Sequence, residues 1–128
     1  MKEVVRTEDA PAPFQGAPYS QAIKANGFVF VSGQLALEPG HKELVPGGIA
    51  EQTEQVLKNL SAILQAAGSS LDQLVKTSVF LQDLGDFAAM NEVYARHVGD
   101  RPPARSTFEV AKLPSGALVE IEAVALLG

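Results

Sequence analysis

Cysteine is missing from this chain of 128 residues, so neither a disulfide framework nor thiolate chemistry is available to it. The absence favours a reducing compartment, and we expect a cytoplasmic protein. Only two histidines are present, His41 and His97, and they are isolated in the sequence. Because the chain offers no metal-ligand spacing, we expect no bound metal.

Long apolar runs and an excess of basic residues are missing too. No stretch approaches the ~20 apolar residues of a membrane-spanning helix, so we expect no membrane partner. The first ten residues carry acids and lack an apolar centre, which argues against a signal peptide. The formal net charge of −5 disfavours a nucleic-acid partner, since nucleic-acid binding usually requires a basic surface. The chain also lacks the lysine of a phosphate-binding loop and the nucleophile elbow of a serine hydrolase.

The chain does contain enough apolar sequence for one domain over residues 1–128. Its hydrophobic content is 46%, and a chain of this length buries roughly two-thirds of its unfolded surface. Apolar residues at helical spacing predict one helix over residues 49–67 and a second through Val98, with Asp86 as its N-terminal cap. The predicted inner stripe of the second helix contains Phe87, Met90, Tyr94 and Val98.

Strand patterns fill most of the remaining chain. Residues 3–7 can form a short strand, and residues 22–32 predict two strands that turn at Asn26-Gly27. The apolar run from Phe28 to Val31 predicts a central strand covered on both faces. Residues 74–81 alternate as a further strand. The order of strands and helices predicts an α/β (α+β) sandwich, with two helices on one face of a partly parallel sheet.

The segment from Arg101 to Glu122 predicts two closing strands around a loop at residues 112–116. Each strand alternates, so that charged residues share one side. The charged side of the last strand also carries Leu118, Val124 and Leu126, a mixture that suits a subunit interface with a polar pocket. Since two helices cover only one sheet face, we expect the other face to form an oligomer interface. We place four residues on that uncovered face: Arg105, Thr107, Glu120 and Leu126.

Several motifs in this chain carry a family resemblance. The run Pro103-Ala104-Arg105-Ser106, followed by Glu120-Ile121-Glu122, resembles the signature of the RidA family of enamine/imine deaminases. Further matching motifs occur in order along almost the whole chain: Pro18–Ala22, Val31–Gln34, Gln52-Thr53, Asp83-Leu84, and Asp86-Phe87 with Asn91. The resemblance implies a chorismate-mutase-like fold with a mixed six-stranded sheet. It also implies a homotrimer with inter-subunit pockets, and a last strand that lies centrally where local sequence alone predicts a hairpin.

The resemblance also implies a site and a reaction. Arg105 is expected to anchor a substrate carboxylate, Glu120 to orient the attacking water, and Tyr19 to line the pocket. Backbone N–H groups of Gly33 and Thr107 are expected to assist, and Thr107 stands where many members carry cysteine. Ser32 and Asn91 complete the expected substrate-binding residues. The implied reaction is the cofactor-free hydrolysis of reactive 2-imino acids or enamines to 2-oxo acids and ammonia.

Other interpretations of the same residues stay open at this point. Arg105 could be an ion-pair partner of Glu120 or Glu122, Tyr19 an aromatic anchor for its loop, and Asn91 a structural hydrogen-bonding group. At the level of function, the alternatives are a non-catalytic protein that binds or senses a small carboxylate, and an endoribonuclease or translation inhibitor.

Overall fold

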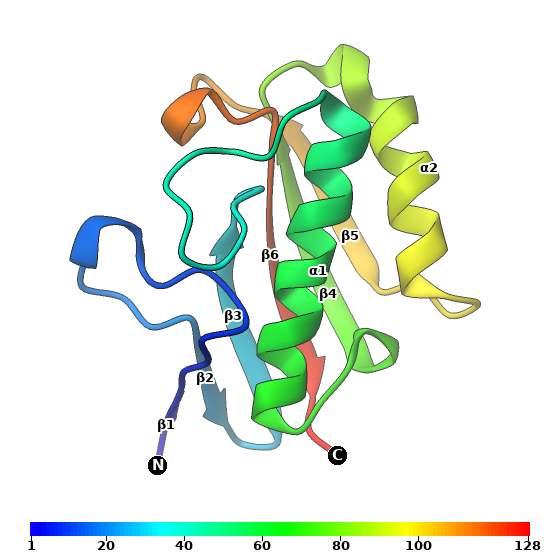
Figure 1. Ribbon diagram of the computed structural model, residues 1–128. Helices are drawn as coiled ribbons and strands as arrows, with labels where there is room; N and C mark the ends of the chain where they lie inside the picture. Colours follow the sequence, from blue (N-terminus) through cyan, green and yellow to red (C-terminus); the bar gives the residue numbers. More distant parts are fainter.

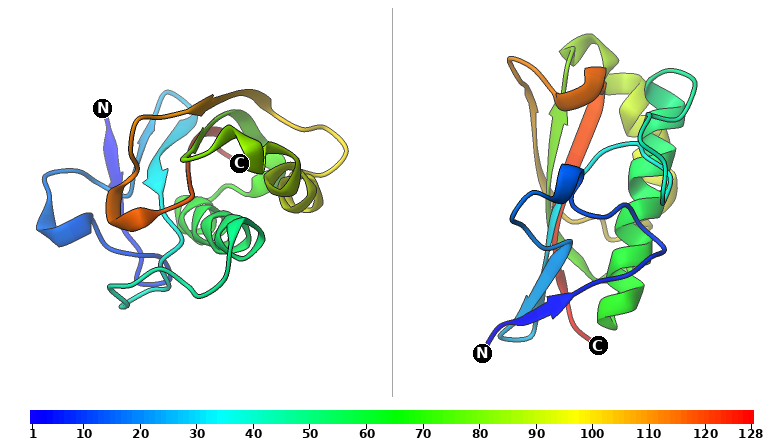
Figure 2. Two further views of the ribbon diagram at one scale, coloured as in Figure 1. Left: turned by 90° about the horizontal axis from the view of Figure 1, so that it is seen from above. Right: turned by 60° about the vertical axis from the view of Figure 1, so that its left-hand side comes forward.

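The computed structural model describes residues 1–128 as a sheet with two helices packed against one of its faces (Figure 1). The strands are β1 (Glu3–Val5), β2 (Ala22–Ala25), β3 (Phe28–Gln34), β4 (Leu74–Leu81), β5 (Ala104–Glu109) and β6 (Val119–Leu126). The helices are α1 (Ile49–Ala67) and α2 (Phe87–Val98). Both lie on the same side of the sheet in the views of Figure 2. The predicted mixed six-stranded sheet with two helices on one face is confirmed.

Helix α1 begins and ends where the sequence predicts. The Glu51 side chain turns back to accept a hydrogen bond from the Gly48 N–H at 2.8 Å, which satisfies a donor at the helix start. Gly68 ends the helix in the left-handed conformation, with φ of 87°, which costs glycine little because it has no Cβ. Between these ends, one stripe faces the core and is fully buried: Val56, Leu57, Leu60, Ile63 and Leu64.

Helix α2 differs from the prediction in two details. The Asp86 side chain makes no capping hydrogen bond; instead Asp83, before the preceding turn, accepts one from the Gly85 N–H. Phe87 does not join the core, since 40% of its surface is exposed, whereas Met90, Tyr94 and Val98 are buried as expected. His97 near the end of α2 forms a 2.9 Å hydrogen bond with Glu54 of α1, so it links the two helices.

The strand order is β1-β2-β3-β6-β4-β5, which places the last strand in the interior of the sheet. β6 pairs antiparallel with both β3 and β4, while β4 and β5 form the parallel pair around the α2 crossover. The hairpin that local sequence predicts between the last two strands is therefore wrong, and the order implied by the family resemblance is right. The loop between β5 and β6, orange in Figure 1, carries the chain back from the edge to the centre.

The two sheet faces differ sharply in composition. Residues paired directly across strands share a face, and Ile121 of β6 pairs with Val79 of β4 on the buried, helix-covered side. The opposite face has no cover in this chain, and Phe30, Phe108 and Leu126 are 46%, 53% and 44% exposed there. The prediction of an uncovered face is confirmed. The run from Phe28 to Val31, however, is covered by the chain itself on one side alone.

Arg105 and Thr107 lie on the helix-covered face, so their predicted place beside Glu120 is wrong. In the parallel register, Arg105 is opposite Thr77 and Thr107 is opposite Val79, both of which point toward the helices. It is Ser106 and Phe108 that share the uncovered face with Glu120 and Glu122. Alternation shows which residues of a strand lie on the same side, but the pairing with β4 decides which side that is.

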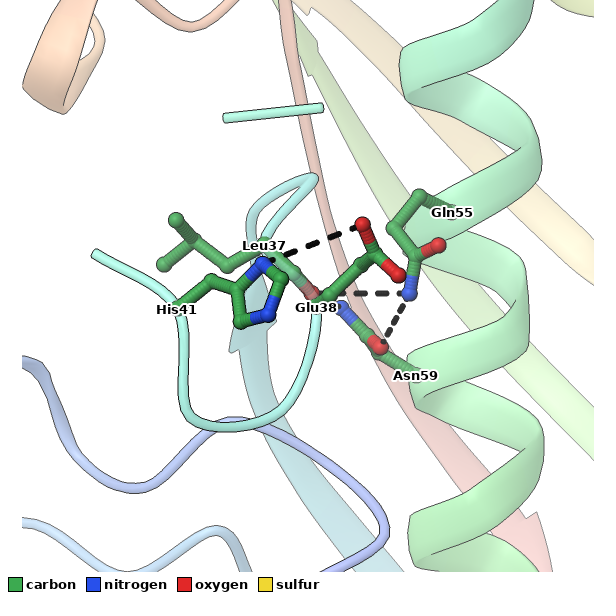
Figure 3. Close-up of polar contacts among 5 residues, drawn as sticks. All are labelled: Leu37, Glu38, His41, Gln55 and Asn59. Carbon is green, nitrogen blue, oxygen red and sulfur yellow. Dashed lines mark hydrogen bonds and ion pairs between the residues drawn. The ribbon is translucent and has the colours of Figure 1, made fainter. Parts of the chain in front are cut away.

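A pair of amide side chains on α1 fixes the path of the chain after β3 (Figure 3). The Asn59 amide, almost fully buried, donates to the backbone oxygens of Leu35 at 3.0 Å and Leu37 at 2.9 Å. Gln55 donates in turn to the Asn59 side-chain oxygen at 2.9 Å. Leu35 and Leu37 both line the largest cavity described below, so this pair helps to set one wall of it.

Candidate active site

The first cavity, of about 500 Å³, lies between the N-terminal loop and the strands β3 and β6. Its lining includes Tyr19, Ser32, Gly33, Leu37, Glu120 and Glu122. Four of the residues predicted for the active site therefore meet in one place: Tyr19, Ser32, Gly33 and Glu120.

A β-bulge shapes the floor of this cavity. Val31 pairs with Ala123 and Gln34 pairs with Ile121, so β3 contains one more residue than β6 over this interval. Such a bulge bends the strand and redirects its side chains, and bulges are frequent beside active sites. Gly33 lies in the bulge, where a Cβ atom would overlap the Glu120 carboxylate. Glycine at this position is therefore what lets the carboxylate rest against the backbone.

Glu120 is the titratable group best placed for chemistry in this cavity. Its side chain is half-buried, and it makes no hydrogen bond or ion pair with any residue of the chain. Burial raises the pKa of the Glu120 carboxyl, and the negative charge of Glu122 raises it further. A carboxyl group whose pKa is raised toward neutrality is suited to taking up and releasing a proton. The alternative of an Arg105 ion pair with either glutamate does not occur within the chain, because Arg105 lies on the other face.

The loop that carries Tyr19 is fastened to β3 by backbone and side-chain hydrogen bonds. The Ser32 hydroxyl donates to the Ser20 oxygen at 2.6 Å, and the Ser32 N–H donates to the Gln21 oxygen at 2.9 Å. The Tyr19 phenol oxygen accepts the Phe14 N–H at 2.7 Å. Tyr19 is thus an anchor for its loop, in agreement with the second of the two interpretations of this residue given by the sequence. Because the oxygen acts there as acceptor, its proton remains free to donate to a ligand in the cavity.

Two buried amides that support the site were given no role by the sequence. The Gln21 side chain accepts the Thr7 N–H at 2.7 Å and donates to the Thr7 oxygen at 3.0 Å and the Pro11 oxygen at 2.8 Å. It thereby holds the loop that forms the outer wall of the cavity. Asn59 serves the opposite wall in the same way. In the sequence, Gln21 and Asn59 are distinguished only as amides within an otherwise apolar or small-residue context. A buried amide needs hydrogen-bond partners, and no other sequence signal indicates their role.

The second cavity, of about 370 Å³, lies between α2 and the start of β5, and Asn91, Tyr94 and Arg105 line it. The Arg105 guanidinium carbon lies 4.9 Å from the ring centroid of Tyr94, and no carboxylate of the chain forms an ion pair with it. The Asn91 side-chain oxygen is buried without a hydrogen-bond partner. A guanidinium fork with no acid partner is well suited to a small carboxylate, whereas the Asn91 oxygen can only accept a hydrogen bond from a donor on a ligand.

Thr107 lies close to this cavity on the edge strand β5. The Val110 N–H donates to the Leu81 oxygen, and N–H directions alternate along a strand, so the N–H groups of Arg105 and Thr107 point to the open edge of the sheet. The expected use of the Thr107 backbone N–H is compatible with this direction. Its side-chain oxygen is buried without a partner.

The predicted site residues thus fall into two groups that do not meet within one chain. Glu120 lies on β6 on the uncovered face, whereas Arg105 lies on β5 on the helix-covered face, with β4 between these strands. The chain has no cluster of three side chains able to hold a metal ion, and none of its helices is long and apolar enough to span a membrane.

Comparison with known proteins identifies the family of the chain. Residues 7–127 match the model of a family described as Endoribonuclease L-PSP. A RutC family protein of Pyrococcus horikoshii is 54% identical over 125 residues, which cover 98% of both chains. The 2-iminobutanoate/2-iminopropanoate deaminase of Mus musculus is 44% identical over 128 residues, which cover all of this chain and 93% of the mouse protein. The crystal structure of E. coli TdcF with bound serine matches with a TM-score of 0.90 and 37% identity, over 98% of this chain and 99% of TdcF.

These matches define an α+β chain of the Endoribonuclease L-PSP type over nearly its whole length. The chain belongs to that family, which includes the RidA and RutC proteins. The family resemblance seen in the sequence motifs is confirmed.

Proposed function

We propose that this protein hydrolyses reactive 2-imino acids, and the enamines in equilibrium with them, to 2-oxo acids and ammonia. The observation that carries the proposal is the complementarity of the two cavities. One offers a guanidinium with no acid partner, and the other offers a half-buried carboxyl group of raised pKa. The mouse relative is named for this reaction, and the TdcF structure holds serine, itself a small carboxylate with nitrogen on its α-carbon.

The complete site forms between subunits of a homotrimer. Two features support this part of the proposal: the uncovered face with its exposed Phe30, Phe108 and Leu126, and the location of Arg105 on the edge strand β5. The Arg105 cavity of one subunit closes over the Glu120 cavity of its neighbour. Such an arrangement covers apolar surface and completes three identical sites at once.

In this arrangement the residues divide the work of binding and proton transfer. Arg105 grips the substrate carboxylate with two parallel hydrogen bonds, and the N–H groups of Gly33 and Thr107 donate to the bound ligand. Glu120 takes a proton from a water molecule as that water adds to the imine carbon, and passes the proton to the imine nitrogen. The same carboxyl group then assists transfer of the hydroxyl proton to nitrogen. The carbon–nitrogen bond breaks, ammonia leaves, and the 2-oxo acid forms.

The direct test couples the protein to a threonine dehydratase, which releases 2-iminobutanoate. Disappearance of the imine is followed with and without the protein, together with the release of ammonia. We expect faster disappearance with wild-type protein and loss of that gain with Glu120→Gln. An unchanged decay rate would refute the deaminase, and binding of a carboxylate without turnover would indicate the non-catalytic binder instead. Ribonuclease activity that survives nuclease-free repurification would favour the endoribonuclease.

A further inference from the structure

Aromatic side chains of α2 hold Arg105 in place, and no acid takes part. The guanidinium carbon lies 4.9 Å from the ring centroid of Tyr94 and 5.5 Å from that of Phe87. Both distances fall within the ~6 Å over which a ring face attracts a cation. The ion pairs of the chain all involve other residues.

Tyr94 is the better fixed of the two rings. Its hydroxyl shares a 2.6 Å hydrogen bond with the Thr77 hydroxyl, and the two residues are 5% and 0% exposed. Thr77 is also the residue opposite Arg105 in the parallel register of β4 and β5. Burial raises the pKa of the Tyr94 phenol, while the Thr77 hydrogen bond, the positive charge of Arg105 and the polar contact with its guanidinium oppose the rise. The phenol therefore stays neutral and keeps its hydrogen bond.

We propose that Tyr94 is a positioning residue: its ring face, locked by Thr77, orients the Arg105 guanidinium for a ligand carboxylate. The inference rests on the proposed function only in taking Arg105 as the carboxylate anchor. No motif of the sequence assigned a role to Tyr94 beyond packing in the core.

Holding a cation by a ring has a specific advantage over holding it by an acid. A guanidinium carries five N–H donors, and a ring face offers no carboxylate oxygen to accept them, so a cation held by rings keeps most of its donors free. Lys24 shows the contrasting case, since its ammonium is bound to Glu3 at 3.1 Å. An acid beside Arg105 would compete with the substrate for the same donors, and it would lower the attraction for an anion. Tyr94 supplies orientation without that competition.

The test compares Tyr94→Leu, which removes the ring, with Tyr94→Phe, which keeps it, in the full-length protein. Binding of 2-oxobutanoate, the product of the proposed reaction, is measured by calorimetry, and the kcat and KM of imine hydrolysis are measured in parallel. We expect Tyr94→Leu to raise the Kd and KM about tenfold with a smaller change in kcat. Tyr94→Phe keeps the ring face but loses the Thr77 hydrogen bond that locks it, so we expect it to raise the Kd and KM only about two- to threefold, which is the effect of the lock alone. Phe87→Leu, at the more exposed and more distant ring, should fall between them.

A role that acts through Arg105 must disappear when Arg105 is changed. In an Arg105→Lys background, Tyr94→Leu should therefore alter Kd and KM much less than in wild type. A purely structural role predicts the opposite pattern. Tyr94→Leu would then lower the melting temperature and the fraction of active protein in both backgrounds and leave KM unchanged. That result would overturn the inference.

If Tyr94→Leu does not fold, the wild-type protein still decides the question by NMR. Protons of the Arg105 guanidinium held over a ring must resonate upfield, and the signal is assigned by its loss in Arg105→Lys. An unshifted resonance would overturn the inference. The two proposals can also fail separately. Imine hydrolysis with an unchanged KM in Tyr94→Leu would refute the positioning role alone. Absent hydrolysis, with 2-oxobutanoate binding weakened by Tyr94→Leu, would refute the deaminase and support the positioning role.

Discussion

The two cavities of this chain are built by different means. The shape of the Glu120 cavity depends on the path of the backbone: a bulge in β3, a glycine without space for a Cβ, and loops held by buried amides. The Arg105 cavity is lined by residues of α2, by the loop that follows it and by Arg105 at the start of the edge strand β5. A group that exchanges protons with the reacting centre gains from a fixed backbone frame, whereas an anchor needs donors that remain free. Substitutions in the two cavities, and on the face between subunits, should therefore differ in the size and kind of their effects.

The largest effect is expected from separating the cavities that assembly is proposed to unite. Phe108→Glu places a charge on the uncovered face, where the wild-type side chain is already exposed in the chain, so folding should persist. Because the anchor and the acid would no longer meet, we expect turnover to fall roughly 10⁴-fold or more. Light scattering should show a monomer in place of a trimer.

Val4→Glu, at a comparably exposed position on the distant strand β1, serves as the control and should stay trimeric and active. A wild-type protein that is monomeric at micromolar concentration, or an active monomeric variant, would contradict the inter-subunit site.

Glu120→Gln removes the proton-transfer group but keeps the shape of the side chain. We expect kcat to fall by a factor of about 10²–10⁴, while the Kd for 2-oxobutanoate changes little. Calorimetry and the coupled imine assay give the two quantities separately. Were kcat to remain at the wild-type value, Glu120 would have no part in the proton transfer.

Arg105→Lys keeps the charge of the anchor but loses the planar fork. Losing one charge-assisted hydrogen bond of about 1.5–3 kcal/mol should lower kcat/KM roughly 10- to 150-fold, with little change in melting temperature. Near-native hydrolysis would contradict the carboxylate fork.

Arg105→Ala and Glu120→Gln provide a further check when they are refolded together. If each site takes its acid and its anchor from different subunits, random mixing restores both groups at roughly a quarter of the sites. No recovery of activity in the mixture would place both groups of a site in the same subunit.

Gly33→Ala tests the backbone frame of the first cavity. The added methyl overlaps the Glu120 carboxylate, which can swing away on its flexible side chain, so stability should change little. Displacing the carboxylate should nevertheless lower kcat about tenfold. Combined with Glu120→Gln, the same substitution should have almost no further effect, and an additive loss would show that it acts elsewhere.

The smallest effect is expected from Glu122→Gln, on the same strand face two residues from Glu120. Removing its negative charge takes away one cause of the raised pKa of Glu120, so that pKa should fall toward the ordinary value. Activity that depends on the ionised Glu120 rises with pH as the group loses its proton. This rising part of the pH–rate profile should therefore move to lower pH in the variant. A pH–rate profile from about pH 4 to 8 measures the shift. A shift to higher pH would contradict the assignment.

Local patterns predicted the helices and most strands because each depends on residues close in the chain. Ile49–Ala67 was predicted to the residue, and the Asn26-Gly27 turn lies where expected, with both residues at positive φ. The prediction of a hairpin between the last two strands was wrong because it too used only residues close in the chain. Local sequence cannot show that β6 pairs with β3 and β4, which are distant from it in the sequence. The family resemblance supplied that order.

The candidate site was harder to predict than its residues. The motifs named Arg105 and Glu120, and alternation showed which neighbours share a side with each. The placement of Arg105 beneath α2 depends on the parallel register with β4, which no pattern within β5 encodes. The same holds for Tyr94, whose contacts with Thr77 and Arg105 join a helix to two strands. The amides of Gln21 and Asn59 likewise reach backbone groups 10 to 24 residues away along the chain.

The location of Arg105 and Glu120 on opposite faces of one sheet has a consequence for how the protein behaves on dilution. No hinge or loop movement within a chain can unite them, because the sheet itself stands between. In the proposed assembly, specific activity therefore depends on protein concentration and falls steeply once subunits separate. A newly made chain would remain inert until it met two others, so the cellular level of the protein would set its activity more steeply than in direct proportion.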